Sequence, residues 1–214
     1  MPAHCNHDHG SPHHHHHGAA PGEPVPPGYR KVLWIALVVN ATMFFLETGA
    51  GVSAGSASLL ADAIDFFGDA TNYGLSLAVL AMGAVARARA ALFKAGTLVL
   101  FGVAVLVRAA WGALHGVPPE PMTMGLVGAL ALAANVGVGV LLYAFRAGDA
   151  NMRGVWLCTR NDAIGNLAVL LAALGVFGTG SRWPDLLVAA VMAGLGLSAG
   201  LSVLRQARRE LSVA

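Results

Sequence analysis

Two short stretches of this chain, ADAIDFFGDA at residues 61–70 and WLCTRNDAIGN at residues 156–166, place ionisable side chains inside apolar sequence. Asp65 and Asp69 lie four residues apart in the first stretch, and Cys158 and Asp162 lie four apart in the second. On an α-helix, residues at this spacing share one face. A carboxylate at the centre of a bilayer costs about 2.5–3.5 kcal/mol to insert, so three idle aspartates would cost on the order of 8–10 kcal/mol. These side chains are therefore expected to have a function.

The composition around these stretches is that of an integral membrane protein. The 214 residues are 56% hydrophobic and 11% charged, which is too apolar for one soluble domain. The net charge of +2 does not indicate nucleic-acid binding, because the basic residues lie between apolar blocks instead of forming a patch. Cys5 and Cys158 provide no disulfide framework.

Six apolar blocks are long enough to cross a bilayer, which takes about 20 residues each. Their approximate limits are 31–53, 57–84, 92–113, 122–145, 153–177 and 183–205. The links between them are short, so neighbouring helices should run antiparallel. The predicted fold is an all-α integral membrane protein, a six-transmembrane-helix bundle spanning residues 30–208, with a short C-terminal tail at residues 209–214.

The basic residues predict the orientation of this bundle. With a cytoplasmic N-terminus, both chain ends are cytoplasmic and the outer loops keep only Arg182, as the positive-inside rule requires. The basic residues then on the cytoplasmic side are Arg30, Lys31, Arg87, Arg89, Lys94, Arg146, Arg153, Arg205, Arg208 and Arg209. Two others, Arg108 and Arg160, lie within spans. Arg108 is expected to extend to the outer interface or to pair with Glu47.

Residues 1–29 differ from the rest of the chain and are predicted to be a disordered, cytoplasmic, His-rich tail. They contain eight of the nine histidines and six prolines, and no apolar segment of the kind found in signal peptides. The side chains that could capture zinc loosely are His4, Cys5, His7, Asp8, His9, His13, His14, His15, His16 and His17. The alternative is that the histidine run is a purification tag.

The second and fifth spans are expected to bring their ionisable pairs together. Counted from the outer ends of the spans, Asp69 and Asp162 lie about 18 and 22 Å deep at 1.5 Å per residue, which agrees to within one turn. Three carboxylates and one thiolate meeting there would supply the four ligands of a tetrahedral zinc site. Arg160 is a candidate ion-pair partner, but it lies about 200° around the helix from Cys158 and from Asp162.

Two further polar residues have more than one interpretation. Asp62, one turn outward of Asp65, either lines an outer access path or bonds a neighbouring helix. Asn166, one turn beyond Asp162, either supports the metal ligands or makes a helix–helix hydrogen bond, and the hydrogen bond is favoured. The recurring glycines of the spans permit close helix contacts that could serve gating, or are ordinary membrane packing.

The run FLETGAGVSAGSASLLADAIDFFGDA, residues 45–70, resembles the first two spans of the cation diffusion facilitators, and CTRNDAIGN, residues 158–166, resembles their fifth-span motif, usually His-x-x-x-Asp. The resemblance implies an antiporter that exchanges protons for divalent cations and exports zinc, and sometimes cadmium, cobalt, iron or manganese. It also implies a homodimer in the bacterial inner membrane. By that motif, Asp65, Asp69, Cys158 and Asp162 would hold the metal as a transported substrate and not as a permanent cofactor.

The sequence departs from the family pattern in three ways. Cys158 replaces the usual histidine, which favours zinc or cadmium over manganese and magnesium. The cytoplasmic domain common after the sixth span is not expected, since about nine residues follow Arg205. The stretch from Arg87 to Lys94 contains no His or Asp, so a second site sometimes found there is not expected either.

An exchange mechanism follows from the ligand types. Metal must displace protons from the carboxyl and thiol groups, so a near-neutral cytoplasm favours loading and a more acidic exterior favours release. A non-transporting metal scaffold or sensor and a passive metal channel are the alternatives. An enzyme is not expected, because no Ser/His/Asp or Cys/His set is apparent around Cys158.

Overall fold

The computed structural model describes residues 26–78, 84–147 and 150–213, and within these ranges every regular element is an α-helix. Each helix contains the larger part of one predicted span, which confirms the all-α fold. The helices are α1 (Tyr29–Ala54), α2 (Ala57–Ala78), α3 (Ala84–His115), α4 (Pro121–Tyr143), α5 (Ala150–Thr179) and α6 (Trp183–Val213). Residues 1–25 of the predicted tail lie outside the described ranges.

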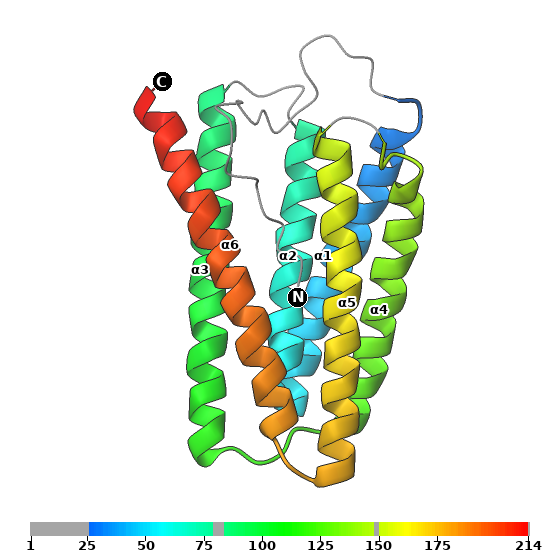
Figure 1. The fold of residues 1–214 in the computed structure, drawn as a ribbon, viewed down its shortest axis with the longest axis vertical. Helices are drawn as coiled ribbons and strands as arrows, with labels where there is room; N and C mark the ends of the chain where they lie inside the picture. The colour runs from blue at the N-terminus through cyan, green and yellow to red at the C-terminus, as the bar shows by residue number, and fades with distance from the viewer. Residues whose placement is uncertain (1–25, 79–83, 148–149, 214) are drawn as a thin grey trace.

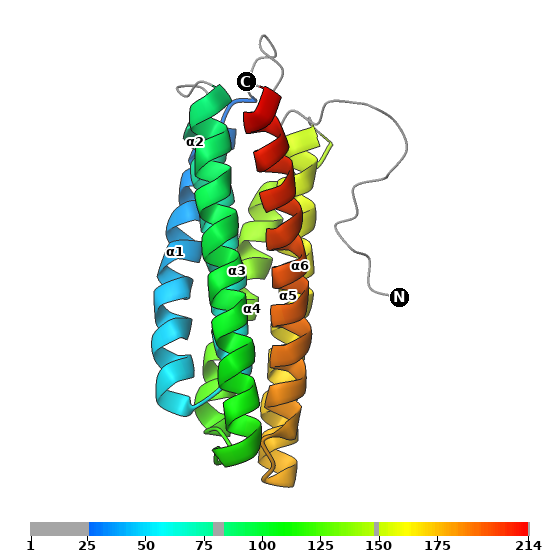
Figure 2. The same cartoon turned by 90° about the vertical axis from the view of Figure 1, so that its left-hand side faces the viewer.

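The six helices of the described ranges run up and down in one bundle (Figure 1). The main packing pairs are α1 with α2, α4 with α5, and α3 with α6. Helix α2 also contacts α3, α5 and α6, so it occupies the middle of the bundle. The view in Figure 2 places α3 and α6 in front of the other helices. Helix α6 crosses the bundle obliquely, from the lower ends of α2 and α5 toward α3 (Figure 1).

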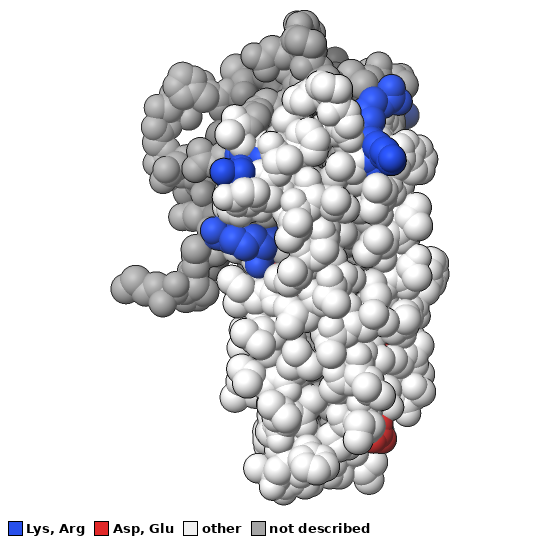
Figure 3. Space-filling view, turned by 90° about the vertical axis from the view of Figure 1, so that its right-hand side faces the viewer, with Lys and Arg blue, Asp and Glu red and all other residues white. Residues whose placement is uncertain are grey.

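The surface of the bundle is that of a protein surrounded by lipid. In the described ranges, five helical segments are long and apolar enough to cross a membrane: Tyr29–Ala54, Ala95–His115, Pro121–Tyr143, Val155–Thr179 and Trp183–Arg205. Helix α2 is the exception, because three aspartates interrupt it. Large apolar side chains such as Phe45, Phe93 and Phe177 point outward and are about three-quarters exposed. Figure 3 shows basic side chains toward one end of a largely uncharged face, and an acidic side chain toward the other end.

The turn between α1 and α2 is set by a glycine in the left-handed region. Gly55 has φ 71° and ψ 18°, which L-residues with a side chain rarely adopt. Its N–H donates to the Val52 carbonyl at 3.4 Å, and the Ser56 N–H donates to the Gly51 carbonyl at 3.0 Å. This pair of bonds is the Schellman termination of a helix. It reverses the chain within two residues and so places α2 directly against α1.

Asp185, in the first turn of α6, fixes the start of α2. Its carboxylate is 1% exposed and accepts hydrogen bonds from the Ser56 hydroxyl at 2.7 Å and the Ser58 hydroxyl at 2.6 Å. It also accepts from the backbone N–H groups of Ala57 at 2.9 Å and Ser58 at 3.0 Å. These N–H groups begin α2 and have no partner within the helix. The N-terminal end of α2 is thereby joined to α6 by a buried polar contact.

Candidate metal centre

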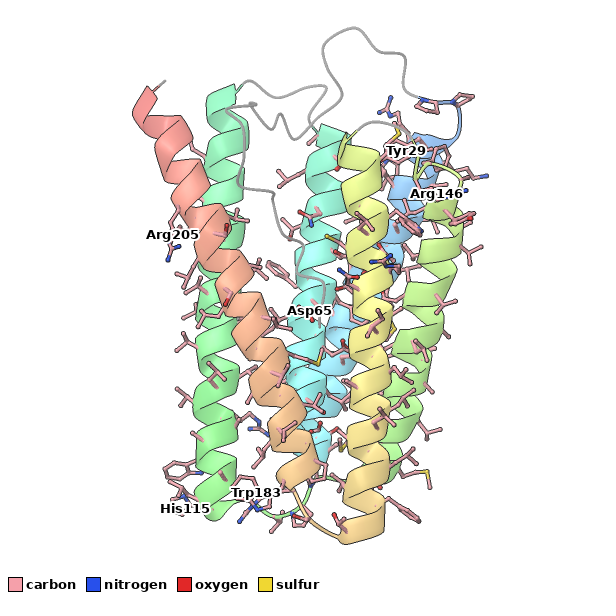
Figure 4. The ribbon with its side chains drawn as sticks, in the orientation of Figure 1. Tyr29, Asp65, His115, Arg146, Trp183 and Arg205 are labelled. Atoms are coloured by element: carbon pink, nitrogen blue, oxygen red, sulfur yellow. The ribbon has the colours of Figure 1, made fainter. Side chains whose placement is uncertain are left out.

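The predicted site residues lie on two helices that contact each other. Asp65 and Asp69 are on α2, and Cys158 and Asp162 are on α5. Figure 4 shows Asp65 about midway along the bundle. Asp69 is 7% exposed, whereas the other three side chains are half-buried, and Cys158 is a reduced thiol. Each predicted pair, which we call a half-site, thus lies on one helix, and the two helices contact each other.

The aspartates of the two helices are close enough to interact electrostatically. Asp162 interacts with Asp69, Asp65 and Asp62, and Asp65 interacts with Asp62 and Asp69. The Asp65 side chain also faces α6, since its Oδ1 lies 3.9 Å from the point where a Cβ on Gly196 would stand. Within the described ranges, no three His, Cys, Asp or Glu side chains are placed to hold one metal ion. Helices α2 and α5 thus bring aspartates near one another, but the described side chains do not form a metal-binding group. The four-ligand site stays a prediction.

A tyrosine and a threonine join the two half-sites. The Tyr73 hydroxyl donates to Oδ2 of Asp69 at 2.7 Å and lies 2.7 Å from the Thr159 hydroxyl. Tyr73 is 1% exposed and Thr159 is 0% exposed. Both were missed by the sequence reasoning, although their positions gave a signal: Tyr73 lies one turn beyond Asp69, and Thr159 follows Cys158 directly. They connect α2 to α5 at the depth of the predicted ligands.

Of the two alternatives given for Arg108, pairing with Glu47 is wrong, and extension to the interface stays a prediction. Arg108 is exposed on α3, which packs chiefly against α6, while Glu47 is fully buried on α1. The neighbour of Glu47 is Asp62 of α2, which is also fully buried. The two carboxyl groups approach each other, yet none of their four oxygens makes a hydrogen bond of acceptable geometry. Asp62 therefore borders a second carboxyl group, and both interpretations of its role stay open.

Two other residues can be placed directly. Asn166 accepts a hydrogen bond from the Asn135 amide at 3.2 Å, which links α5 to α4 within the bundle. Arg160 is exposed, donates to Asn161 Oδ1 at 3.3 Å and lies over the Trp156 ring at 5.5 Å. It thus lies away from the face that carries Cys158 and Asp162, as the helical geometry predicts. The tail residues proposed to capture metal, His4 to His17 with Cys5, lie outside the described residues.

Comparisons with known proteins bear on this arrangement. Residues 33–212 match the family model described as the cation efflux transmembrane domain. The metal cation efflux system protein CzcD of Cupriavidus metallidurans is 29% identical over 192 residues, which are 83% of this chain and 60% of that protein. A protein of Bacillus velezensis described as a cadmium, cobalt and zinc/H(+)-K(+) antiporter is 24% identical over 192 residues, 81% of this chain and 60% of that protein. The chain therefore spans less than two thirds of the length of these relatives.

Proposed function

This chain belongs to the cation efflux family, and from that premise we propose that it exports divalent transition-metal cations, zinc foremost, through a site made by Asp65, Asp69, Cys158 and Asp162. The observation that carries the proposal is the approach of Asp162 on α5 to Asp69 and Asp65 on α2. Carboxylates that meet inside an apolar bundle need a cation or protons for charge compensation. A transported divalent cation alternating with protons satisfies this need.

The ligand set supports a preference among metals. Zinc is commonly bound by four ligands that include thiolates and carboxylates, whereas manganese and magnesium favour oxygen ligands in six-fold coordination. Cys158 is the one sulfur ligand of the set and makes the site softer. Zinc and cadmium are therefore the proposed substrates, with cobalt as a further candidate. One relative carries the names of cadmium, cobalt and zinc in its description.

The proposed direction of transport follows from the distribution of charge. Tyr29, Arg146 and Arg205 lie toward one end of the bundle and His115 and Trp183 at the other (Figure 4). We assign the end with Tyr29 and Arg146 to the cytoplasm, because the basic residues collect there. Metal then loads from the cytoplasm by displacing protons and leaves when protons from outside return. The proposed location is the bacterial inner membrane, and the proposed assembly is a homodimer.

Zinc uptake into proteoliposomes with a controlled pH difference tests this function. The native chain should move zinc and protons in opposite directions, and Asp162→Asn should reduce zinc flux to the background of empty vesicles. Glu120→Gln is the matched control, since Glu120 is an exposed carboxylate at the outer end of the bundle. Cys158→His should retain flux and change the ratio of zinc to cadmium transport.

The same experiment separates the proposal from its two rivals. A scaffold or sensor would bind zinc in an Asp162-dependent manner and give no flux. A passive channel would give zinc flux that follows the metal gradient alone and moves no protons. Either result would overturn the proposed antiport.

A further inference from the structure

The bridge from Asp69 through Tyr73 to Thr159 is a buried polar contact between α2 and α5. The Tyr73 hydroxyl lies 2.7 Å from Asp69 Oδ2 and 2.7 Å from Thr159 Oγ1. All three residues are less than a tenth exposed. The Tyr73 ring packs in an apolar cluster with residues of α1, α4 and α5, among them Leu33 and Val138. Its hydroxyl is therefore held in place by a ring that has little room to rotate.

The donors of this bridge can be assigned from the number of protons. An ionised carboxylate only accepts hydrogen bonds, and a phenol has one proton to donate. Tyr73 therefore donates to Asp69, and Thr159 donates to the oxygen of Tyr73. The Thr159 hydroxyl also donates to the Val155 carbonyl of its own helix at 3.1 Å, so its one proton is shared between this carbonyl and the oxygen of Tyr73. The two hydroxyls form a chain of donors that ends on Oδ2 of Asp69.

We propose that Tyr73 and Thr159 are positioning residues that hold Asp69 as a metal ligand through one oxygen and thereby set the preference for zinc over manganese. The inference rests on the proposed function, because it takes Asp69 as a ligand. A carboxylate whose Oδ2 accepts a hydrogen bond favours metal coordination through Oδ1. One oxygen per carboxylate suits four-coordinate zinc, whereas a cation that prefers six oxygen ligands would find too few of them at this site.

The same bridge also controls the spacing of the two half-sites. Thr159 is adjacent to Cys158, so the hydrogen bond from Thr159 to Tyr73 fixes a ligand-bearing turn of α5 against α2. Side chains that orient metal ligands in this way typically change metal affinity or activity by about 10–100-fold when removed. Loss of the bridge should therefore weaken zinc binding and relax the choice of metal together.

Four variants and two measurements test the proposal. Zinc and manganese affinities are measured by competition with a metal-binding dye on the full chain in detergent, and uptake of both metals is measured in proteoliposomes. Tyr73→Phe should weaken zinc binding by about 10–100-fold and lower the zinc-to-manganese ratio. Thr159→Val should act in the same direction, Thr159→Ser should resemble the native chain, and Tyr73→Phe with Thr159→Val should add little to Tyr73→Phe alone.

Matched controls separate the bridge from general damage to the fold. Tyr143→Phe removes the same hydroxyl from an exposed tyrosine of α4, and Thr71→Val removes a hydroxyl that donates to the Phe67 carbonyl of its own helix. Both should keep the native affinities and metal ratio. If Tyr73→Phe fails to fold, the comparison of Thr159→Val with Thr159→Ser still decides, because both are close in size to threonine.

The outcomes for this inference and for the proposed function are distinct. Native transport together with an unchanged zinc-to-manganese ratio in Tyr73→Phe and Thr159→Val would overturn the bridge and leave the transporter standing. Zinc binding that Tyr73→Phe weakens in a chain that moves no metal would support the bridge and overturn transport. A native chain that binds no zinc would overturn both.

Discussion

Asp185 and Asp62 are both buried aspartates, yet their surroundings differ in the number of hydrogen-bond donors. Asp185 accepts four hydrogen bonds where α6 meets the start of α2. Asp62 accepts none of acceptable geometry and has the carboxyl group of Glu47 as its neighbour. A buried carboxylate with donors stabilises the fold, whereas one without donors costs free energy. The contact of Asp185 with the N-terminal end of α2 thus stabilises the fold, whereas the buried carboxyl groups of Glu47 and Asp62 cost free energy.

Removing Asp185 should have the largest effect on stability. Asp185→Ala leaves the N–H groups of Ala57 and Ser58 without acceptors inside the bundle, and we expect a loss of about 3–5 kcal/mol in the free energy of unfolding. Denaturant unfolding of the purified chain in detergent measures it. Asp185→Asn, which keeps one acceptor oxygen, should lose less. Equal stability of Asp185→Ala and the native chain would mean that this joint contributes nothing.

Neutralising Glu47 and Asp62 together should raise the free energy of unfolding instead of lowering it. Glu47→Gln with Asp62→Asn replaces two crowded acids by amides that can donate to each other, and we expect a gain of about 1–2 kcal/mol in the free energy of unfolding. The same denaturant experiment measures it, with Glu120→Gln as a control for loss of a carboxylate. A loss of stability similar to that of Asp185→Ala would show that Glu47 and Asp62 also have a structural role.

Removing the hydrogen bond between the neutral side chains of Asn135 and Asn166 should change the stability by an amount between these two effects. Asn135→Leu removes the donor to Asn166 across α4 and α5, and hydrogen bonds between helices in membranes contribute about 1 kcal/mol. We expect a loss of that size. Because Asn166 then remains as an unpaired buried amide, Asn135→Leu with Asn166→Leu should recover part of it. A double mutant less stable than either single mutant would indicate that packing, not the hydrogen bond, matters at this level.

These contacts also mark what could be predicted from the sequence. The helices follow from the length of the apolar blocks, and the pairs at spacing four on α2 and α5 follow from helical geometry. The neighbours across helices do not follow, because the order of packing is set by tertiary contacts. For that reason Arg108, one of the two alternatives for which was a pairing with Glu47, is not beside it, and Glu47 lies beside Asp62. The partners of Asp185 and Tyr73 do not follow from the sequence either. The sequence position of Tyr73, one turn beyond Asp69, marks it as a candidate, but the partner of a capping or bridging side chain is known only once the neighbouring helix is placed.

The smallest effect is expected at Glu120, an exposed carboxylate that has donors. Glu120 is the N-cap of α4 and accepts from the backbone N–H groups of Met122 and Thr123. Hydrogen bonds from Thr123, and a weaker one from Met122, lower the pKa of Glu120 from its ordinary value. A lowered pKa in the folded state means that the stabilisation is present above the ordinary carboxyl pKa and is lost as the pH falls through the lowered one.

Glu120→Ala should therefore unfold at a slightly lower temperature than the native chain at pH 7, and the difference should shrink as the pH falls below the ordinary carboxyl range. Thermal unfolding of both chains across that range in detergent measures it. Glu120 is exposed to water, whereas Asp185 accepts from a similar set of backbone donors in a buried position. The decrease in unfolding temperature should therefore be much smaller for Glu120→Ala than for Asp185→Ala. Equal shifts in the two variants would show that burial adds nothing to a capping carboxylate, and the contrast between Asp185 and Asp62 would then need another cause.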